Sequence, residues 1–362
     1  MEGRDGRVVR ALNVLALNSG SSSLKFGMYR VDSAGAYKLL GETLSTGTAP
    51  DHADAMARVV SALAASGMPP ADAIGHRVVH GGPALRQHGR IDDAVLRQLQ
   101  AAAAFAPLHT PAALALIRSA QAHFSGLPQV ACFDTQFHAC LPDVARLLPI
   151  ARELLSEGVQ RYGFHGLSLE SIVRQLGADV PERLVIAHLG SGASITALKA
   201  GRSIDTSMGL TPSGGVVMAT RSGDLDPGVL LYLLREKHFD AAALQALVDH
   251  RSGLLGISGL SGDMRRLHEA AQSNADARLA VEMFCMSVRK QVAAMAAVLG
   301  GLDMLVFTGG IGENDAQVRH EICSGLQWLG VSVDASASRC QVRVLASQED
   351  AQIARHVWAA LA

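Results

Sequence analysis

Hydrophobic and polar positions form two different patterns along this chain. Short apolar runs bounded by glycine or polar residues recur at intervals, and longer segments rich in alanine and leucine lie between them. The short runs predict buried strands, and the longer segments predict helices. The predicted strands are 14–17, 76–80, 129–133, 184–189, 193–198 and 304–310, and the predicted helices include 91–104, 111–123, 240–250 and 274–299. This alternation predicts an α/β fold.

The chain also contains a weak internal repeat. Placing residues 14–21 over residues 184–191 aligns four apolar residues with four apolar residues, and then a Gly-Ser pair with a Gly-Ser pair. Such a repeat predicts a duplicated domain in which each half opens with a strand, a Gly/Ser turn and a returning strand. We place the first domain at residues 1–137 and the second at 138–348. The last helix, 349–362, is expected to pack back onto the first domain.

Length, composition and charge narrow the class of protein. A chain of 362 residues with 49% hydrophobic residues is long enough for two globular cores. Its net charge of −1 provides no long-range attraction for nucleic acid or an anionic membrane. The longest apolar stretches are interrupted by polar, glycine or proline residues, so we expect no membrane span. Five cysteines without a CxxC spacing indicate reduced thiols and a cytoplasmic protein.

Three glycine-rich loops follow predicted strands. The first, "NSGSSSLKF", contains Lys25, and the others lie at 188–192 and 307–314. Glycine lets successive backbone N–H groups turn toward one anion, and such a nest binds phosphate. Each loop alone could be an ordinary turn, but three in one chain predict a phosphate or nucleotide site. The GxxxxGK[ST] pattern of a P-loop does not occur in the sequence.

Four further residues have the character of reactive or anion-binding groups. Arg77 lies in a predicted strand, and Arg221 lies in a polar loop. Either arginine could form a structural salt bridge, for example with Asp224 or Asp226, or could hold a carboxylate or phosphoryl group through its guanidinium fork. Asp134 ends an apolar strand, and His165 lies between an aromatic residue and a glycine, which are places where α/β folds keep reactive groups.

Taken together, these motifs resemble the acetate kinase family, within the larger group that has the actin- and hexokinase-like ATPase fold. The matching stretches span residues 14 to about 350 in the family's order. They are "NSGSSSLKF", "GHRVVHGG", "PLHTP", "FDTQFH", "RYGFHG", "HLGSGAS", "MGLTPSGGVVMATRSGDLDPG", "SGLSGDMR" and "FTGGIGEN". The resemblance implies two duplicated actin/hexokinase-like (ribonuclease H-like) α/β domains with a nucleotide cleft between them.

The resemblance also implies a role for each matching residue. Asp134, His165 and Arg221 would be catalytic, and Arg77, Val79, Leu108, Phe164 and Pro212 would bind the carboxylic acid. ATP would be bound by Lys25, His188, Leu189, Gly190, Ser191, Gly192, Asp263, Met264, Arg265, Gly310, Ile311, Gly312, Glu313 and Asn314. Asn18 and Glu349 would be associated with Mg²⁺, or with Mn²⁺ in its place.

Three short stretches depart from the family pattern. Ser191 stands where an asparagine is usual, and Ala219 stands where a glycine is usual. Leu167 and Leu169 replace a threonine and a second histidine. These changes affect the affinity or the acid preference expected of the site, and they remove no residue that the chemistry requires.

The expected reaction is reversible, Mg²⁺-dependent transfer of a phosphoryl group from ATP to acetate by direct in-line attack. A short carboxylic acid has a pKa of roughly 4.3, so it is ionised at neutral pH and needs no general base. Asp134 is therefore expected to hold metal-bound water or to orient a guanidinium. Propionate or another short acid is an alternative substrate, and a nucleotide-gated binding protein of the same fold is an alternative function. The resemblance further implies a homodimer.

Overall fold

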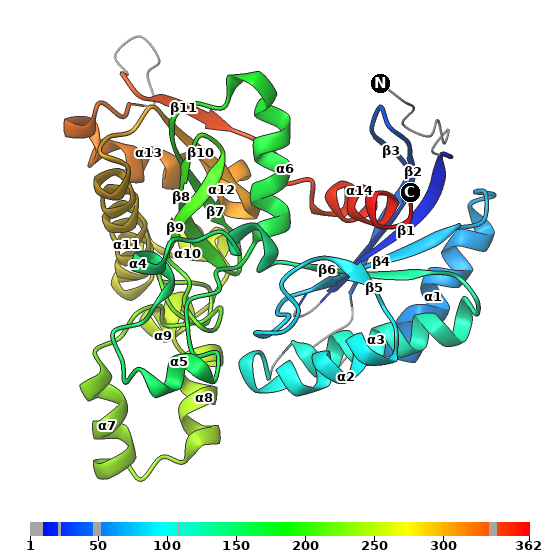
Figure 1. Cartoon of the computed structure of the whole chain (residues 1–362). Helices are drawn as coiled ribbons and strands as arrows, with labels where there is room; N and C mark the ends of the chain where they lie inside the picture. Colours follow the sequence, from blue (N-terminus) through cyan, green and yellow to red (C-terminus); the bar gives the residue numbers. More distant parts are fainter. Residues whose placement is uncertain (1–9, 21–22, 46–51, 108, 333–338) are drawn as a thin grey trace. The chain divides into compact units, whose positions relative to one another are not determined.

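The computed structural model describes residues 10–20, 23–45, 52–107, 109–332 and 339–362. The chain forms two compact units. Unit 1 contains residues 1–136, 166–171 and 348–362, and unit 2 contains residues 137–165 and 172–347. Each unit has one β-sheet with helices packed against it (Figure 1), which confirms the predicted α/β class.

Unit 1 is built on a six-stranded sheet in the order β3-β2-β1-β4-β6-β5. Its strands are β1 (Leu12–Ser19), β2 (Ser23–Val31), β3 (Ala36–Ser45), β4 (Ala73–Val78), β5 (Gly89–Arg90) and β6 (Gln129–Phe133). Its helices are α1 (His52–Ala65), α2 (Asp93–Ala101), α3 (Thr110–His123) and α14 (Glu349–Leu361). β2 pairs antiparallel with both β1 and β3, whereas β1, β4 and β6 run parallel.

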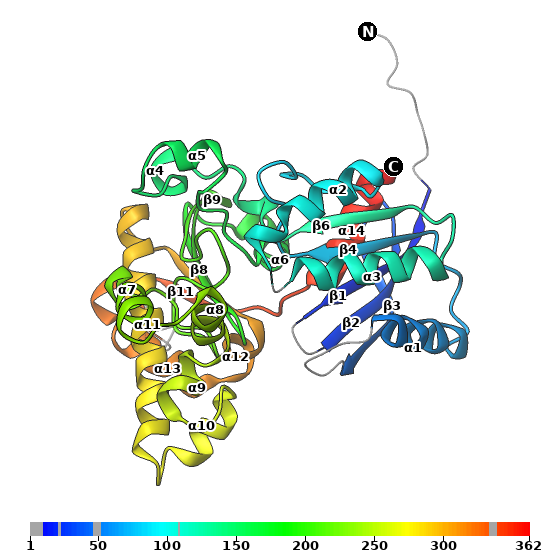
Figure 2. The same cartoon turned by 90° about the horizontal axis from the view of Figure 1, so that it is seen from below.

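Strand β1 is apolar throughout because both faces of the sheet are covered. Val14 and Ala16 pack in one cluster with Ile353 and Val357 of α14. Their neighbours Leu15 and Leu17 point to the other face, where α1 and α3 supply the partners. Figures 1 and 2 show α14 on one side of this sheet and α1 and α3 on the other. Burial on both faces explains why the run could be recognised as a strand.

Gly75 in β4 allows α14 to approach the sheet closely. A Cβ atom at this position would lie 2.4 Å from Cγ2 of Ile353 and 2.6 Å from Cγ2 of Val357. We therefore expect Gly75→Ala to lower the free energy of unfolding by about 1–3 kcal/mol, the usual cost of overpacking. Urea denaturation and hydrogen exchange of residues 349–362 would measure the change. Gly89→Ala on β5 is the matched control because a Cβ there meets no atom within 4 Å. Equal stability of the two variants would contradict the prediction.

Unit 2 is built on a five-stranded sheet in the order β11-β10-β7-β8-β9. Its strands are β7 (Arg183–Leu189), β8 (Ala193–Lys199), β9 (Arg202–Thr206), β10 (Met304–Thr308) and β11 (Gln341–Val344). Its helices are α4 (Asp143–Arg146), α5 (Glu153–Ser156), α7 (Pro227–Glu236), α8 (Ala241–His250), α9 (Gly253–Ser258), α10 (Met264–Ala270), α11 (Ala275–Leu299), α12 (Gly309–Asn314) and α13 (Ala316–Ser324). Helix α6 (Gly166–Leu176) begins in unit 1 and ends in unit 2.

The two sheets share one topology. In unit 1 the order β3-β2-β1-β4-β6 combines two antiparallel pairs with two parallel pairs, and β9-β8-β7-β10-β11 repeats this pattern in unit 2. β1 corresponds to β7 and β2 to β8, so the duplication predicted from the short repeat is confirmed.

Two predicted elements differ from the structure. The segment 91–104 is not one helix, because α2 ends at Ala101 and a 3₁₀ helix, Ala102–Phe105, follows. The glycine-rich stretch 307–314 is not an open loop, because its second part forms the short helix α12. None of the helices in the described part of the chain combines the length and the apolar character needed to cross a bilayer.

Candidate functional site

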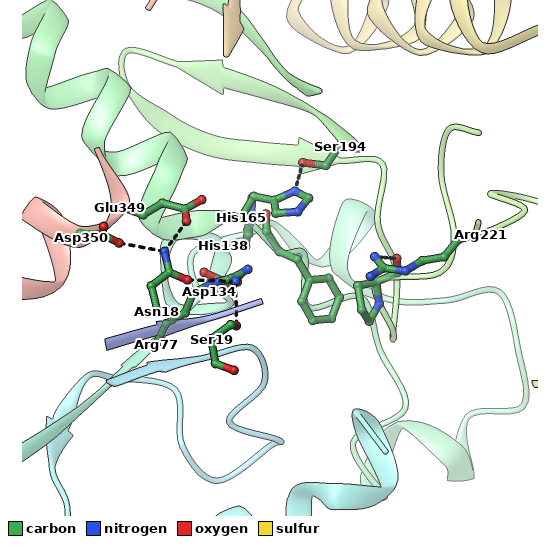
Figure 3. A network of polar contacts seen from close by, with 12 residues as sticks. Asn18, Ser19, Arg77, Asp134, His138, His165, Ser194, Arg221, Glu349 and Asp350 are labelled. Atoms are coloured by element: carbon green, nitrogen blue, oxygen red, sulfur yellow. Dashed lines mark hydrogen bonds and ion pairs between the residues drawn. The ribbon is translucent and has the colours of Figure 1, made fainter. Parts of the chain in front are cut away.

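The end of β1 in unit 1 brings an amide against two carboxylates. Asn18 is 4% exposed, and its Nδ2 donates to Oε2 of Glu349 and to Oδ1 of Asp350, each at 2.9 Å (Figure 3). Both carboxylates lie in the first turn of α14. Asn18 and Glu349, which the family resemblance associates with the metal, are thus in direct contact. Asp350 was missed, although two adjacent carboxylates at the start of the last helix were a usable signal.

Arg77 and Asp134 form a buried ion pair beside Asn18. Nη2 and Nε of Arg77 donate to Oδ2 of Asp134 at 2.6 and 2.9 Å, and Nη1 donates to Oδ1 of Asn18 at 3.3 Å. Burial raises the pKa of the Asp134 carboxyl, and the charge and hydrogen bonds of Arg77 oppose that rise. Burial alone would lower the pKa of Arg77, but Asp134 and Glu349 raise it, so the guanidinium stays protonated. Asp134 therefore orients Arg77.

The oxygen atoms of this group suit a hard divalent cation. Oδ1 of Asp134 is buried and has no hydrogen-bond partner among the described residues. Glu349 and Asp350 add carboxylate oxygens next to the Asn18 amide. Mg²⁺ and Mn²⁺ prefer carboxylate, carbonyl and water oxygens over nitrogen or sulfur. The donors present therefore fit the predicted metal.

The remaining predicted residues of unit 1 lie near this group or outside the described chain. Lys25 pairs with Asn18 across β1 and β2. Burial raises the pKa of the Asp350 carboxyl above its ordinary value, and the charge of Lys25 opposes part of that rise. Val79 is half-buried one residue beyond the end of β4. Leu108 lies outside the described residues.

In unit 2, His165 occupies a conformation that few residues with a side chain adopt. It precedes α6 with φ 60° and ψ 22°, in the left-handed region. His138 holds the preceding peptide, since its Nε2 lies 3.0 Å from the carbonyl oxygen of Phe164. Gly163, at φ 73°, leaves space for this imidazole, because a Cβ there would lie 2.6 Å from the His138 ring. Burial lowers the pKa of His138 to about 4, so the ring is neutral and donates from Nε2.

The His165 ring faces a glycine loop and the second predicted arginine. Its Nδ1 lies 2.9 Å from Oγ of Ser194, and its ring stacks on His188 with centroids 4.2 Å apart. A Cβ on Gly192 would lie 3.3 Å from Nε2 of His165 and 3.2 Å from Nη1 of Arg221. Gly192 therefore lies directly against two nitrogen groups, and a side chain at this position would crowd both of them.

Arg221 is held by its own loop. Its Nη1 donates to the carbonyl oxygen of Pro212 at 3.1 Å. The two carboxylates considered as alternative partners make other hydrogen bonds: Asp224 accepts from the Gly215 N–H, and Asp226 accepts from the Gly228 N–H at the start of α7. Arg221 and Pro212, both predicted site residues, are thus brought together.

The second and third glycine segments lie side by side in unit 2. A Cβ on Gly309 would lie 2.7 Å from the carbonyl oxygen of Leu189, and one on Gly190 would lie 3.8 Å from the Gly310 nitrogen. The side chains of two predicted nucleotide-binding residues form hydrogen bonds with the protein backbone. Oε1 of Glu313 accepts from the backbone N–H groups of Gly309 and Ser347, each at 2.9 Å, and Asn314 donates to the Gly310 carbonyl.

The segment predicted to lie on the adenosine side begins α10. Asp263 accepts from the Arg265 N–H at 2.9 Å and pairs with its guanidinium at 2.6 Å. The Arg265 hydrogen bond lowers the pKa of Asp263. Arg265 is largely exposed, and Met264 is buried.

The departures from the family pattern fall into two places. Leu167 and Leu169 are buried, and Leu167 belongs to the core cluster that contains Ile353 of α14. The carbonyl oxygen of Ser191 accepts from the Ala219 N–H at 3.2 Å, so these two departures contact each other.

A separate cluster in unit 1 contains His88, Glu170 and His356, whose potential ligand atoms lie within 4.8 Å of one another. Nε2 of His356 lies 2.7 Å from Oε2 of Glu170. Nδ1 of His88 accepts from the Phe133 N–H at 2.9 Å, so a neutral ring carries its proton on Nε2. Burial lowers the pKa of His88 to about 3. An Nε2–H cannot bind a metal, so the cluster is better described as a polar contact between α6 and α14.

Comparison with known proteins agrees with this architecture. The sequence model of the acetokinase family matches residues 13–358. The acetate kinase of Methylocella silvestris is 41% identical, over 96% of this chain and 98% of its own, and that of Chromobacterium violaceum is 42% identical over 91% and 90%. The acetate kinase structure from Porphyromonas gingivalis has a TM-score of 0.83 at 32% identity over 97% of this chain and 100% of its own. A propionate kinase from Francisella tularensis has a TM-score of 0.84 at 35% identity over 95% and 98%.

The duplicated units define the class of protein, a phosphotransferase with the actin/hexokinase-like ATPase fold. Within that class, the chain belongs to the acetokinase family.

Proposed function

We propose that the chain is an acetate kinase, which transfers the γ-phosphoryl group of ATP to acetate and forms acetyl phosphate and ADP reversibly. The observation that carries the proposal is the approach of Nε2 of His165 and Nη1 of Arg221 to the same glycine, Gly192, where an added Cβ would lie 3.3 and 3.2 Å from them. Two nitrogen groups beside a glycine loop suit phosphoryl oxygens, where charge accumulates during transfer. The roles assigned to the other residues are those that the family resemblance implies, and their contacts support them.

ATP would bind unit 2 through the adjoining segments 188–192 and 309–312, with α10 on the adenosine side. The backbone of glycine segments can approach phosphates closely, and the N-terminus of a helix favours negative charge. Glu313 would act by holding its own segment in place, because its carboxylate already accepts from two backbone N–H groups.

The acetate carboxylate would bind Arg77 in unit 1. The guanidinium is fixed by Asp134 and Asn18 and stays charged, so its orientation is set before substrate arrives. Because acetate is already ionised at neutral pH, no residue has to remove a proton from it. Direct attack by one carboxylate oxygen on the γ-phosphorus then needs only alignment and neutralisation of charge.

Mg²⁺, or Mn²⁺ in its place, would be held by Asn18 and Glu349, with Asp350 and Oδ1 of Asp134 as further oxygen donors. When bound, the metal supplies positive charge to the phosphate oxygens. Lys25, next to Asn18 across the hairpin, adds a cation on the same side of the unit.

The acid's alkyl end would meet Val79, Leu108, Phe164 and Pro212. Phe164 and Pro212 are buried, and Val79 is half-buried. Propionate is the second candidate substrate, and the Francisella tularensis propionate kinase supports it by its similarity to this chain. One methylene changes discrimination by only about 1–3 kcal/mol, so the choice requires measurement.

The test is formation of acyl phosphate from ATP, Mg²⁺ and formate, acetate, propionate or butyrate, each trapped as the hydroxamate. We expect the highest kcat/KM with acetate. An optimum with propionate would keep the mechanism and change the substrate. No product with any acid, while ATP still binds, would contradict the proposal and favour a nucleotide-gated binding protein.

We further propose that the units are two ATPase domains of a cytoplasmic homodimer. The proposed use of ATP as a co-substrate supports a cytoplasmic location, because the cytoplasm supplies ATP. The dimer is supported by α7, whose Val229, Leu231, Tyr232 and Leu234 are 41–52% exposed, because large exposed apolar groups mark interaction surfaces. Sedimentation equilibrium should give twice the mass of one chain, and the mass of a single chain at micromolar concentration would contradict the dimer.

A further inference from the structure

Ser194 is buried next to the histidine that we place at the transferring phosphoryl group. It is the second residue of β8, lies opposite His188 in β7, and is 0% exposed. Its Oγ lies 2.9 Å from Nδ1 of His165 (Figure 3). Among the residues that the structure describes, this nitrogen is the one hydrogen-bond partner of the Ser194 hydroxyl.

The single partner decides which atom donates. A hydroxyl has one hydrogen and two lone pairs, and a neutral imidazole has one N–H and one bare nitrogen. If Nδ1 of His165 carried the proton, Ser194 would accept it, and the hydroxyl hydrogen would be buried without an acceptor. Buried donors without a partner are rarer than under-used acceptors. The hydroxyl of Ser194 therefore donates, and Nδ1 is the bare nitrogen.

A second serine–histidine pair in the same unit has this arrangement. Nε2 of His138 lies 3.0 Å from the carbonyl oxygen of Phe164, which can only accept, so Nε2 carries the proton. Its Nδ1 lies 2.8 Å from Oγ of Ser203, which must then donate. Ser203 and Ser194 are both buried, and each holds the Nδ1 of one histidine.

The other edge of the His165 ring faces Gly192, where we propose that the phosphoryl group is held. The Cβ position on Gly192 lies 3.3 Å from Nε2 and 3.5 Å from Cε1 of His165. A bare nitrogen there would repel phosphoryl oxygens, whereas an N–H would donate to them. The stack of His165 on His188, at 4.2 Å and 19°, also favours neutral rings, because two stacked imidazolium rings would repel each other.

We propose that Ser194 is a positioning residue that fixes His165 in the Nε2–H tautomer. The neutral imidazole can then donate a hydrogen bond from Nε2–H to an oxygen of the transferring phosphoryl group. The assignment of the tautomer stands on the structure alone, and its catalytic consequence rests on the proposed kinase function. Ser194 itself does not touch the substrate in this scheme. It acts through His165.

Nitrogen-15 labelling of the histidines in the full chain tests the tautomer directly. Two-bond proton–nitrogen correlation spectra distinguish Nδ1–H from Nε2–H, and the signals of His165 are identified by their loss in His165→Gln. We expect Nε2–H in the wild type at neutral pH and a mixture of tautomers in Ser194→Ala. A wild-type Nδ1–H form, or an imidazolium, would overturn the proposal even if Ser194→Ala failed to fold.

Kinetics test the consequence. Ser194→Ala is expected to lower kcat about tenfold, the loss of one hydrogen bond, with the KM values for ATP and carboxylate unchanged. Thr196→Val is the matched control: Thr196 lies on the same strand, is equally buried, and bonds Thr206 rather than a histidine. The control should lose stability but keep kcat and the His165 spectrum. An equal loss of kcat in both variants would overturn the positioning role.

Failure of the proposed kinase function and failure of the proposed role of Ser194 would give different results. Absence of acyl phosphate from the wild type would contradict the proposed kinase, and the spectra would still report the tautomer. Acyl phosphate formed by a wild type with Nδ1–H would keep the kinase and remove the role of Ser194.

Discussion

Arg221→Ala is expected to lower kcat for acyl-phosphate formation by about 10³- to 10⁵-fold, the range found for an arginine that stabilises phosphoryl transfer. The charge on the phosphoryl oxygens is greatest in the transition state, so the loss should appear in kcat more than in the KM for ATP. Arg221→Ala removes the hydrogen bond to the Pro212 carbonyl, and the loss of one such bond costs only about 0.5–1.5 kcal/mol, so folding should change little.

The measurement is steady-state kinetics together with thermal unfolding of the same preparation. Arg202→Ala is the matched control, because Arg202 is an exposed arginine of unit 2 at the start of β9. Arg221→Lys should recover only a small part of the rate, since an ammonium lacks the planar fork. Turnover near the wild-type value in Arg221→Ala would remove Arg221 from the site.

Gly192→Ala is expected to lower kcat about 100-fold without unfolding the protein. The new methyl group would lie 3.2 Å from Nη1 of Arg221 and 3.3 Å from Nε2 of His165, and so would displace the two groups assigned to the phosphoryl oxygens. Displacing reacting groups by about 1 Å can cost 10²-fold in rate. Gly192 is not among the glycines with positive φ, so alanine can adopt its backbone conformation.

Gly209→Ala is the matched control, because it replaces a glycine of the same unit by alanine without adding a group beside His165 and Arg221. Gly209 lies in the same unit, its φ is not positive, and a Cβ there meets no atom within 4 Å. This control should keep both stability and kcat. If Gly192→Ala were as active as Gly209→Ala, the positions of His165 and Arg221 beside Gly192 would not matter for the reaction.

Local patterns in the sequence were sufficient for the strands and the duplication. The runs that became β1 and β7 are apolar because both faces of each sheet are covered, and the glycine after each run marks the return of the chain. The stretch 307–314 was harder, because "TGGIGEN" has the composition of a loop. Its helical part begins at Gly309, whose close approach to the Leu189 carbonyl is a tertiary contact that no local pattern contains.

The candidate site was predictable by residue type but not by partner. Arg77 and Asp134 were each singled out, yet the carboxylate that holds Arg77 comes from 57 residues away. Asp350 and Ser194 escaped notice because their importance lies in contacts with Asn18 and His165, and an isolated serine or aspartate carries no such signal. The glycine loops were recognised, but the hydrogen bond that the Glu313 carboxylate accepts from the Gly309 N–H was not.

The position of α14 in the chain has a consequence for synthesis. Asn18 meets Glu349 across 331 residues, and Ile353 and Val357 cover the face of the sheet that carries Val14 and Ala16. A ribosome adding about 5–20 residues per second needs roughly 15–65 s to make that interval. During this time the nascent first sheet has one apolar face without its own cover. The emerging polypeptide therefore offers a long-lived surface for chaperones, and unit 1 can mature only after α14 has left the ribosome, when unit 2 has already been translated.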